Sequence, residues 1–67
     1  MIVIQLNGEE RTFETPPTLL ELIRILELPA QSIAVAVNSE IIPRSEVPHR
    51  RLKTQDHVEI IRAAAGG

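Results

Sequence analysis

Residues 1–26, MIVIQLNGEERTFETPPTLLELIRIL, predict a β-hairpin followed by an amphipathic helix. Apolar and less apolar positions alternate over residues 1–6, which indicates a strand with one buried face. Asn7-Gly8 supplies two residues that tolerate positive φ, and we expect Glu9-Glu10 to extend this turn. Arg11–Thr15 then forms the second strand, so the chain begins with an antiparallel pair.

The helix is delimited by its capping signals. Pro16-Pro17 ends the second strand because proline cannot donate to a β-ladder. Thr18 and Glu21 have the spacing of a capping box. Pro29 stops the helix at or before Leu28, which predicts a helix of about nine to ten residues. Its apolar stripe follows the i, i+3, i+4, i+7 pattern and consists of Leu19, Leu22, Ile23 and Leu26.

The second half of the chain predicts strands and little helix. Ile33–Val37 is an unbroken apolar run, typical of a strand that is buried on both faces. Asn38-Ser39-Glu40 predicts a turn, and Ile41-Ile42, followed by proline, indicates a brief edge strand. Arg44–Lys53 has no clear period, and we expect a turn of 3₁₀ helix within it. His57–Ile61 alternates again and predicts a last strand whose Val58 and Ile60 point inward.

This order of elements, ββαβββ, predicts an α+β fold with one helix on one face of a mixed sheet of four to five strands. A right-handed crossover through the helix sets the first and last strands side by side and parallel. That arrangement is the ubiquitin-like β-grasp. The competing ferredoxin-like fold needs a second helix, for which Arg44–Lys53 is too short and polar. We expect residues 1–62 to form the domain and residues 63–67 a flexible tail.

Composition excludes several classes of function. The 67 residues include no cysteine, so disulfides, thiolate metal sites and a cysteine nucleophile are ruled out. The formal net charge is −2 and Phe13 is the only aromatic residue among Phe, Tyr and Trp, which disfavours nucleic-acid binding. No apolar run approaches the length of a membrane span, and the N-terminus lacks the pattern of a signal peptide. We therefore expect a soluble cytoplasmic protein that binds neither nucleic acid nor membrane.

The polar residues do not assemble a recognisable catalytic or metal-binding motif. His49 and His57 lack a spacing that would direct both at one metal. The carboxylates are scattered, and no pair lies in an apolar pattern that would separate two pKa values for acid–base work. The basic run Arg50-Arg51 with Lys53 reads as a solvated loop. We expect no catalytic residue, no metal and no cofactor, which argues against an enzyme that acts alone.

The C-terminal glycines are the exception. Gly66-Gly67 follows Ala63–Ala65, so the chain ends in a slim segment of small residues. A terminal carboxylate is ionised at neutral pH and must be activated, most simply as an acyl-adenylate, before it reacts. Glycine has no Cβ, and two glycines therefore make the thinnest tether for a narrow tunnel in a partner enzyme. This end suits a carrier protein, which needs no catalytic side chain of its own.

Six segments, taken together in their order and spacing, resemble the ThiS family of sulfur carriers in thiamin (thiazole) biosynthesis. The resemblance covers essentially the whole chain. The segments are Leu6-Asn7-Gly8, Thr18-Leu19-Leu20-Glu21-Leu22, Val35-Ala36-Val37-Asn38, Ile41-Ile42-Pro43-Arg44, Val58-Glu59-Ile60-Ile61-Arg62 and Gly66-Gly67.

The resemblance implies a defined reaction cycle. A ThiF-type, E1-like adenylyltransferase activates the carboxylate of Gly67, and sulfur from a cysteine desulfurase persulfide replaces AMP to leave a thiocarboxylate. Thiazole synthase (ThiG) then uses this sulfur. Gly66, Gly67, Ala65 and Ala64 are the residues expected to enter the partner's active site. The chain lacks the tryptophan that family members often carry near Val47, a departure that leaves the acceptor enzyme open.

Other assignments remain open from the sequence. A MoaD-type carrier for molybdopterin synthesis shares the fold and the diglycine end, and a ubiquitin-like modifier is a further alternative. A different class is a β-grasp interaction module with an inert tail. For any of these we expect partners to dock on the helix-free face of the sheet, where Val3 and Ile61 are the candidate contacts.

Overall fold

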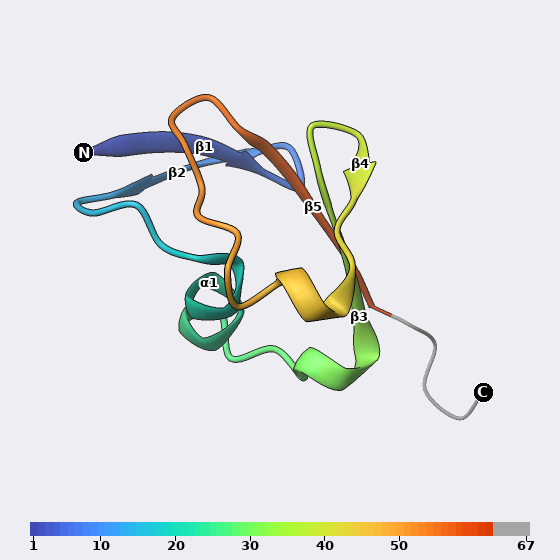
Figure 1. Ribbon diagram of the computed structural model, residues 1–67. Helices are drawn as coiled ribbons and strands as arrows, with labels where there is room; N and C mark the ends of the chain where they lie inside the picture. Colours follow the sequence, from blue (N-terminus) through green and yellow to red (C-terminus); the bar gives the residue numbers. More distant parts are fainter. Residues whose placement is uncertain (63–67) are drawn as a thin grey trace.

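The computed structural model describes residues 1–62, which fold into one sheet with a helix packed on one face (Figure 1). The strands are β1 (Ile2–Leu6), β2 (Glu9–Phe13), β3 (Ile33–Val37), β4 (Glu40–Ile41) and β5 (His57–Arg62). The helices are α1 (Leu19–Ile25) and two 3₁₀ turns, η1 (Ala30–Ser32) and η2 (Arg44–Glu46). The expected 3₁₀ turn after the fourth strand is confirmed by η2.

The order of strands in the sheet is β2-β1-β5-β3-β4. β1 and β5 are parallel neighbours, with Gln5 opposite His57, whereas the other neighbouring pairs are antiparallel. The two ends of the described chain therefore share the middle of the sheet, as the crossover argument predicted. This mixed five-stranded sheet with a single α-helix confirms the ubiquitin-like β-grasp.

The first hairpin is tighter than the sequence suggested. Glu9 pairs with Leu6 and Glu10 with Gln5, so these glutamates belong to β2, and their assignment to the turn is wrong. The turn consists of Asn7 and Gly8 alone, whose φ angles are 49° and 84°. Positive φ at both central residues is what the two-residue type I′ hairpin requires, because its twist matches that of the strands.

The helix begins where the capping box predicts and ends early. The Thr18 N–H donates to Glu21 Oε1 at 2.8 Å, and the Glu21 N–H donates to Thr18 Oγ1 at 3.1 Å. At the other end, Glu27 adopts a φ of 56° and the Leu28 N–H donates to the Ile23 carbonyl at 3.1 Å. This Schellman arrangement closes the helix after seven residues, before Pro29 could act.

The capping box gives the protein a predictable response to acid. Hydrogen bonding to the Thr18 backbone lowers the pKa of Glu21 below its ordinary value of 4.5. Its contribution to stability is therefore complete above that value and disappears as pH falls through the lowered pKa. We expect Glu21→Gln to lower the free energy of unfolding at pH 7 and to have a smaller effect at pH 3, measured by urea denaturation. An equal difference at both pH values would contradict this expectation.

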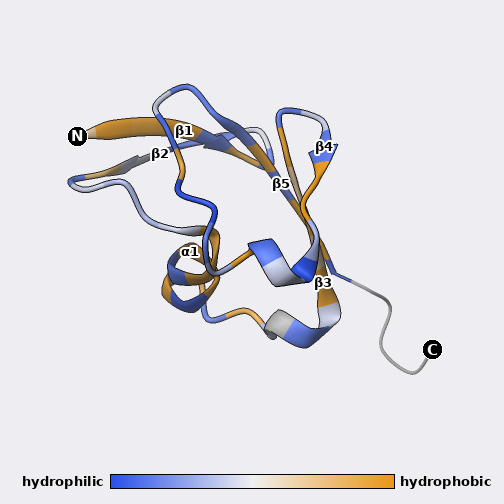
Figure 2. Cartoon of the chain, viewed as in Figure 1, coloured by the Kyte–Doolittle hydropathy of each residue, from blue (hydrophilic) through white to orange (hydrophobic). Residues whose placement is uncertain are grey.

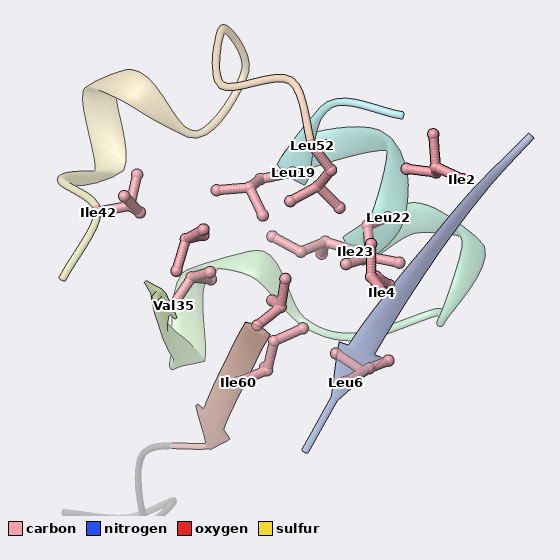
Figure 3. Close-up of a cluster of buried hydrophobic side chains, with 12 residues drawn as sticks. Ile2, Ile4, Leu6, Leu19, Leu22, Ile23, Val35, Ile42, Leu52 and Ile60 are labelled. Carbon is pink, nitrogen blue, oxygen red and sulfur yellow. The ribbon is translucent and has the colours of Figure 1, made fainter. Parts of the chain in front are cut away.

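The core lies between α1 and the inner face of the sheet. Hydrophobic residues follow β1, β3 and α1, while much of the segment between η2 and β5 is hydrophilic (Figure 2). Side chains from these elements converge in one cluster (Figure 3). Its buried members are Ile2, Ile4, Leu6, Leu19, Leu22, Ile23, Val35, Val37, Ile42, Leu52, Val58 and Ile60.

Two details of the core differ from expectation. Ile33–Val37 is not buried on both faces throughout, because Ile33 is half-buried and Ala34 is exposed. Within residues 1–62, α1 packs on the face of β3 that carries Val35 and Val37, whereas Ala34 lies on the opposite face. Leu52, within the segment that showed no period, is 1% exposed and packs into the core.

Candidate functional site

The candidate site is the end of β5, the strand from which the C-terminal residues continue. β5 lies between β1 and β3, and its last residue, Arg62, is paired with Ile33 at the beginning of β3. Val58 and Ile60 are buried, as expected, and anchor the strand to the core. The predicted site residues Ala64, Ala65, Gly66 and Gly67 lie outside the described residues, so their role stays a prediction.

The side chain of Asn7 holds the second half of β5. The Asn7 Oδ1 accepts from the Ile60 N–H at 2.9 Å, and Asn7 Nδ2 donates to the Ile60 carbonyl at 3.3 Å. The Asn7 backbone N–H also donates to the Val58 carbonyl at 2.9 Å. β1 ends at Leu6, so this amide takes the place of the next strand residue and satisfies both backbone groups of Ile60.

A second asparagine holds the beginning of β5 from the other side. Asn38 Oδ1 accepts from the His57 N–H at 2.9 Å, while Asn38 Nδ2 donates to Asp56 Oδ1 at 3.0 Å. Asp56 is 8% exposed, and its other oxygen accepts from the Lys53 N–H at 2.8 Å. Two turn asparagines with positive φ thus hold β5 at its beginning and in its second half.

Sequence reasoning placed both asparagines in turns but gave neither this role, and it counted Asp56 among the scattered carboxylates. The Asn-Gly and Asn-Ser pairs were visible as hairpin signals. The contacts with β5 were not, since they join residues that are 53 positions apart for Asn7 and Ile60, and 19 apart for Asn38 and His57. These residues position the strand that leads to the C-terminus.

The two docking candidates do not lie together. The Val3 carbonyl accepts from the Gln55 N–H, which places Val3 before the beginning of β5, and its side chain is half-buried. Ile61 lies near the end of β5, opposite Ala34, and is 57% exposed. The register places Gln5 opposite His57, so the levels of Val3 and Ile61 are six strand positions apart, which is about 20 Å. Val3 and Ile61 therefore cannot belong to one small patch.

Two other exposed apolar residues, which the sequence analysis did not select, lie on the same face of the sheet as Ile61. Ala34, opposite Ile61, is exposed, and Ile41 on β4 is 66% exposed. The register pairs Ile41 with Ala36, which in turn is opposite Glu59. Along β3, Ala34 and Ala36 alternate with the buried Val35 and therefore point to the helix-free face. Their cross-strand partners Ile61 and Ile41 share that face. We call Ile41, Ala34 and Ile61 the aliphatic strip; it adjoins the end of β5.

The two histidines are exposed and distributed over separate elements, His49 after η2 and His57 at the beginning of β5. Within residues 1–62, no cluster of three or more His, Asp or Glu side chains could hold a metal ion. Across the same residues, no helix has both the length and the apolar character of a membrane span. The candidate site among residues 1–62 is therefore the end of β5 and the residues around it.

Comparison with known proteins identifies the family. The ThiS family model matches residues 4–67, which includes the C-terminal diglycine. The chain belongs to the ThiS family. The sulfur carrier protein ThiS of Thermus thermophilus is 35% identical over 65 residues, covering 97% of this chain and all of that protein. The predicted family resemblance is confirmed.

Two further comparisons extend this finding. A protein named thiazole synthase from Paramagnetospirillum magneticum is 34% identical over 62 residues, which are 92% of this chain and 19% of that protein. The crystal structure of the thiamine biosynthesis protein ThiS from Geobacter metallireducens superposes with a TM-score of 0.85 at 25% identity and covers 98% of this chain and 100% of that one. The fold of this ThiS-family chain is thus that of a solved family member.

Proposed function

We propose that this protein, a ThiS-family sulfur carrier of thiamine biosynthesis, carries sulfur as a thiocarboxylate on its C-terminal Gly67. The Gly67 carboxylate attacks ATP and releases pyrophosphate, which gives an acyl-adenylate. The terminal sulfur of a cysteine desulfurase persulfide then attacks the acyl carbon, and AMP leaves. A first thiol attacks the donor cysteine's sulfur in the resulting S–S bond, which releases the thiocarboxylate and leaves a mixed disulfide. A second thiol then reduces that disulfide, returns the donor cysteine to its thiol form and leaves as the oxidised disulfide.

The observation that carries this proposal is the family match through residue 67, which extends over the diglycine. In this proposal the reacting carboxylate is that of Gly67, and residues 63–67, all alanine or glycine, make a slim tether. The described residues supply a rigid base, since β5 is held by two neighbouring strands and by the amides of Asn7 and Asn38. In this proposal Ala64, Ala65, Gly66 and Gly67 enter the partner's active site.

The proposal assigns the chemistry to partner enzymes and makes this protein a co-substrate. A ThiF-type, E1-like enzyme forms the adenylate, and a cysteine desulfurase supplies sulfur. Thiazole synthase accepts the sulfur, and the 34% identity of this chain to part of a protein of that name supports this partner. The carrier itself then needs no cofactor. We place it in the cytoplasm because the adenylation step consumes ATP.

For docking we retain Ile61 and Val3 as separate contacts. Ile61, with the rest of the aliphatic strip, adjoins the end of β5, so an enzyme that holds the C-terminal residues meets it first. Val3 lies toward the opposite end of the helix-free face and needs a partner that spans the sheet.

Intact-mass spectrometry tests the proposed chemistry. The protein is incubated with ATP, a ThiF-type enzyme, a cysteine desulfurase, cysteine and a thiol reductant. We expect a gain of about 16 Da, which equals that of sulfoxide formation at Met1, so thiol-selective alkylation must follow. A mass shift that alkylation captures supports the thiocarboxylate. An unmodified protein beside a reactive ThiS of another species would contradict the proposal.

A further inference from the structure

The outer edge of β3 is only partly covered by β4. Two residues of β4 pair with Ala36 and Val37, and the Ile42 N–H then donates to the Val35 carbonyl at 2.9 Å. Pro43 follows, and the chain turns away into η2. Alternate residues of a strand direct their backbone groups to the same side, so the N–H and C=O of Ile33 face outward as those of Val35 do. Within residues 1–62, β4 ends before it reaches Ile33.

An apolar groove lies beside this open edge, between β3, α1 and the segment that contains η2. Its cavity volume is about 410 Å³. Leu20 and Ile23 of α1 line one wall, Ile33 and Val35 of β3 the second, and Val47 the third. Arg44 is the charged residue among the described side chains that line it. An open strand edge next to an apolar groove is the geometry to which extended peptides add as a further strand.

The open edge of β3 lies close to the strand that leads to the C-terminus, and this position indicates which partner could bind there. Residues 63–67 extend from Arg62, which is paired with Ile33, and five extended residues span at most about 18 Å. An enzyme that acts on Gly67 must therefore approach the domain at this end. A strand added to β3 would lie about 10 Å from β5, within that reach.

The positive charge of Arg44 at the groove indicates which polar group a bound segment should carry. Arg44 is exposed, and its guanidinium donates one hydrogen bond to the Gln31 carbonyl at 3.1 Å. A guanidinium has five N–H donors, so most of them are left for a partner. A carboxylate is the group that best matches them.

We propose that the open edge of β3 and this groove bind an extended segment of the enzyme that adenylates Gly67, with one aliphatic side chain in the groove and one carboxylate against Arg44. The inference rests on the proposed function, which requires such an enzyme. Its segment pairs with the backbone of Ile33 and holds the domain while the C-terminal residues reach the active site. The groove shares Ala34 and Ile41 with the aliphatic strip, whereas Ile61 is not among the residues that line it.

The test uses the full-length protein as the substrate of a ThiF-type enzyme, with ATP-dependent release of pyrophosphate as the readout. Arg44→Glu replaces the matching charge by a repelling one, and Val47→Ser reduces the apolar wall of the groove. Arg24→Glu is the matched control, because it makes the same charge change on the exposed side of α1, away from the groove. Circular dichroism confirms that each variant is folded.

We expect Arg44→Glu to raise KM by about tenfold, Val47→Ser to raise it less, and both to leave kcat near the wild-type value, since docking precedes chemistry. Arg24→Glu should keep the wild-type KM. A wild-type KM in both groove variants overturns the inference and leaves the proposed function intact. A wild-type protein that dimerises through this edge, and that Arg44→Glu turns into a monomer, also overturns it. An inactive wild-type protein contradicts the proposed function itself, and the inference with it.

Discussion

A variant that lacks Gly66 and Gly67 is expected to fold normally and to form no thiocarboxylate. The deletion moves the terminal carboxylate to Ala65, about 7 Å short of its original reach, and places a Cβ next to the reacting carbon. Folding is unaffected because the described core, from Ile2 to Ile60, contains neither glycine. The measurement is the alkylated intact mass after incubation with ATP, the adenylating enzyme and the sulfur donor.

The control for this deletion is Gly67→Ala, which keeps the length of the chain and adds one methyl group. It separates the need for reach from the need for a slim end: activity in Gly67→Ala and none in the deletion indicates that reach decides. A deletion variant that still gains alkylatable sulfur would contradict a carrier role for Gly67. A deletion variant that still binds its partner as the full-length protein does, with no sulfur gained by either protein, would instead fit an interaction module.

Leu52→Ala is expected to destabilise the domain by about 2–5 kcal/mol, which is a large share of the stability of a domain of this size. Leu52, which lies in the segment after η2, is 1% exposed, and its side chain belongs to the core cluster (Figure 3). Its backbone N–H donates to the Pro17 carbonyl at 2.9 Å, so the segment is attached at this point. Truncation leaves a cavity that the neighbouring side chains fill only in part.

Urea denaturation of Leu52→Ala beside Ile25→Ala measures this effect. Ile25 is 59% exposed, and its truncation should change the free energy of unfolding by no more than about 0.5 kcal/mol. Similar stabilities for the two variants would show that Leu52 is not a core residue. Because the segment that Leu52 anchors also contains Val47, we further expect adenylation of Leu52→Ala to show a raised KM.

Much of the fold was predictable because short stretches of sequence specify its strands, its first turn and the beginning of its helix. The alternation over residues 1–6, the Asn7-Gly8 turn and the capping box of Thr18 and Glu21 each specify conformation within a few residues. The parallel pairing of the first and last strands followed from the handedness of the crossover. The family resemblance, from short segments in order, was also confirmed.

The errors have local causes as well. Glu9 and Glu10 were expected to extend the turn, but they begin β2, an edge strand on which glutamate side chains are exposed to solvent. The helix was expected to continue toward Pro29, but Glu27 adopts the left-handed conformation and closes it. Ala34 was taken as buried because it belongs to the unbroken apolar run Ile33–Val37, yet it is exposed in the structure.

The sequence by itself determined the elements, their order, the β-grasp topology and the family, because each depends on periodicity, turn chemistry or short motifs close along the chain. The tertiary structure alone decided which residues surround the end of β5. Asn7 and Asn38 reach β5 from turns that follow its two neighbouring strands, and Leu52 enters the core from a segment without a period. The groove beside Arg44 is lined by residues of α1, β3 and the segment around η2. These features depend on contacts between residues distant in the chain, which no local pattern encodes.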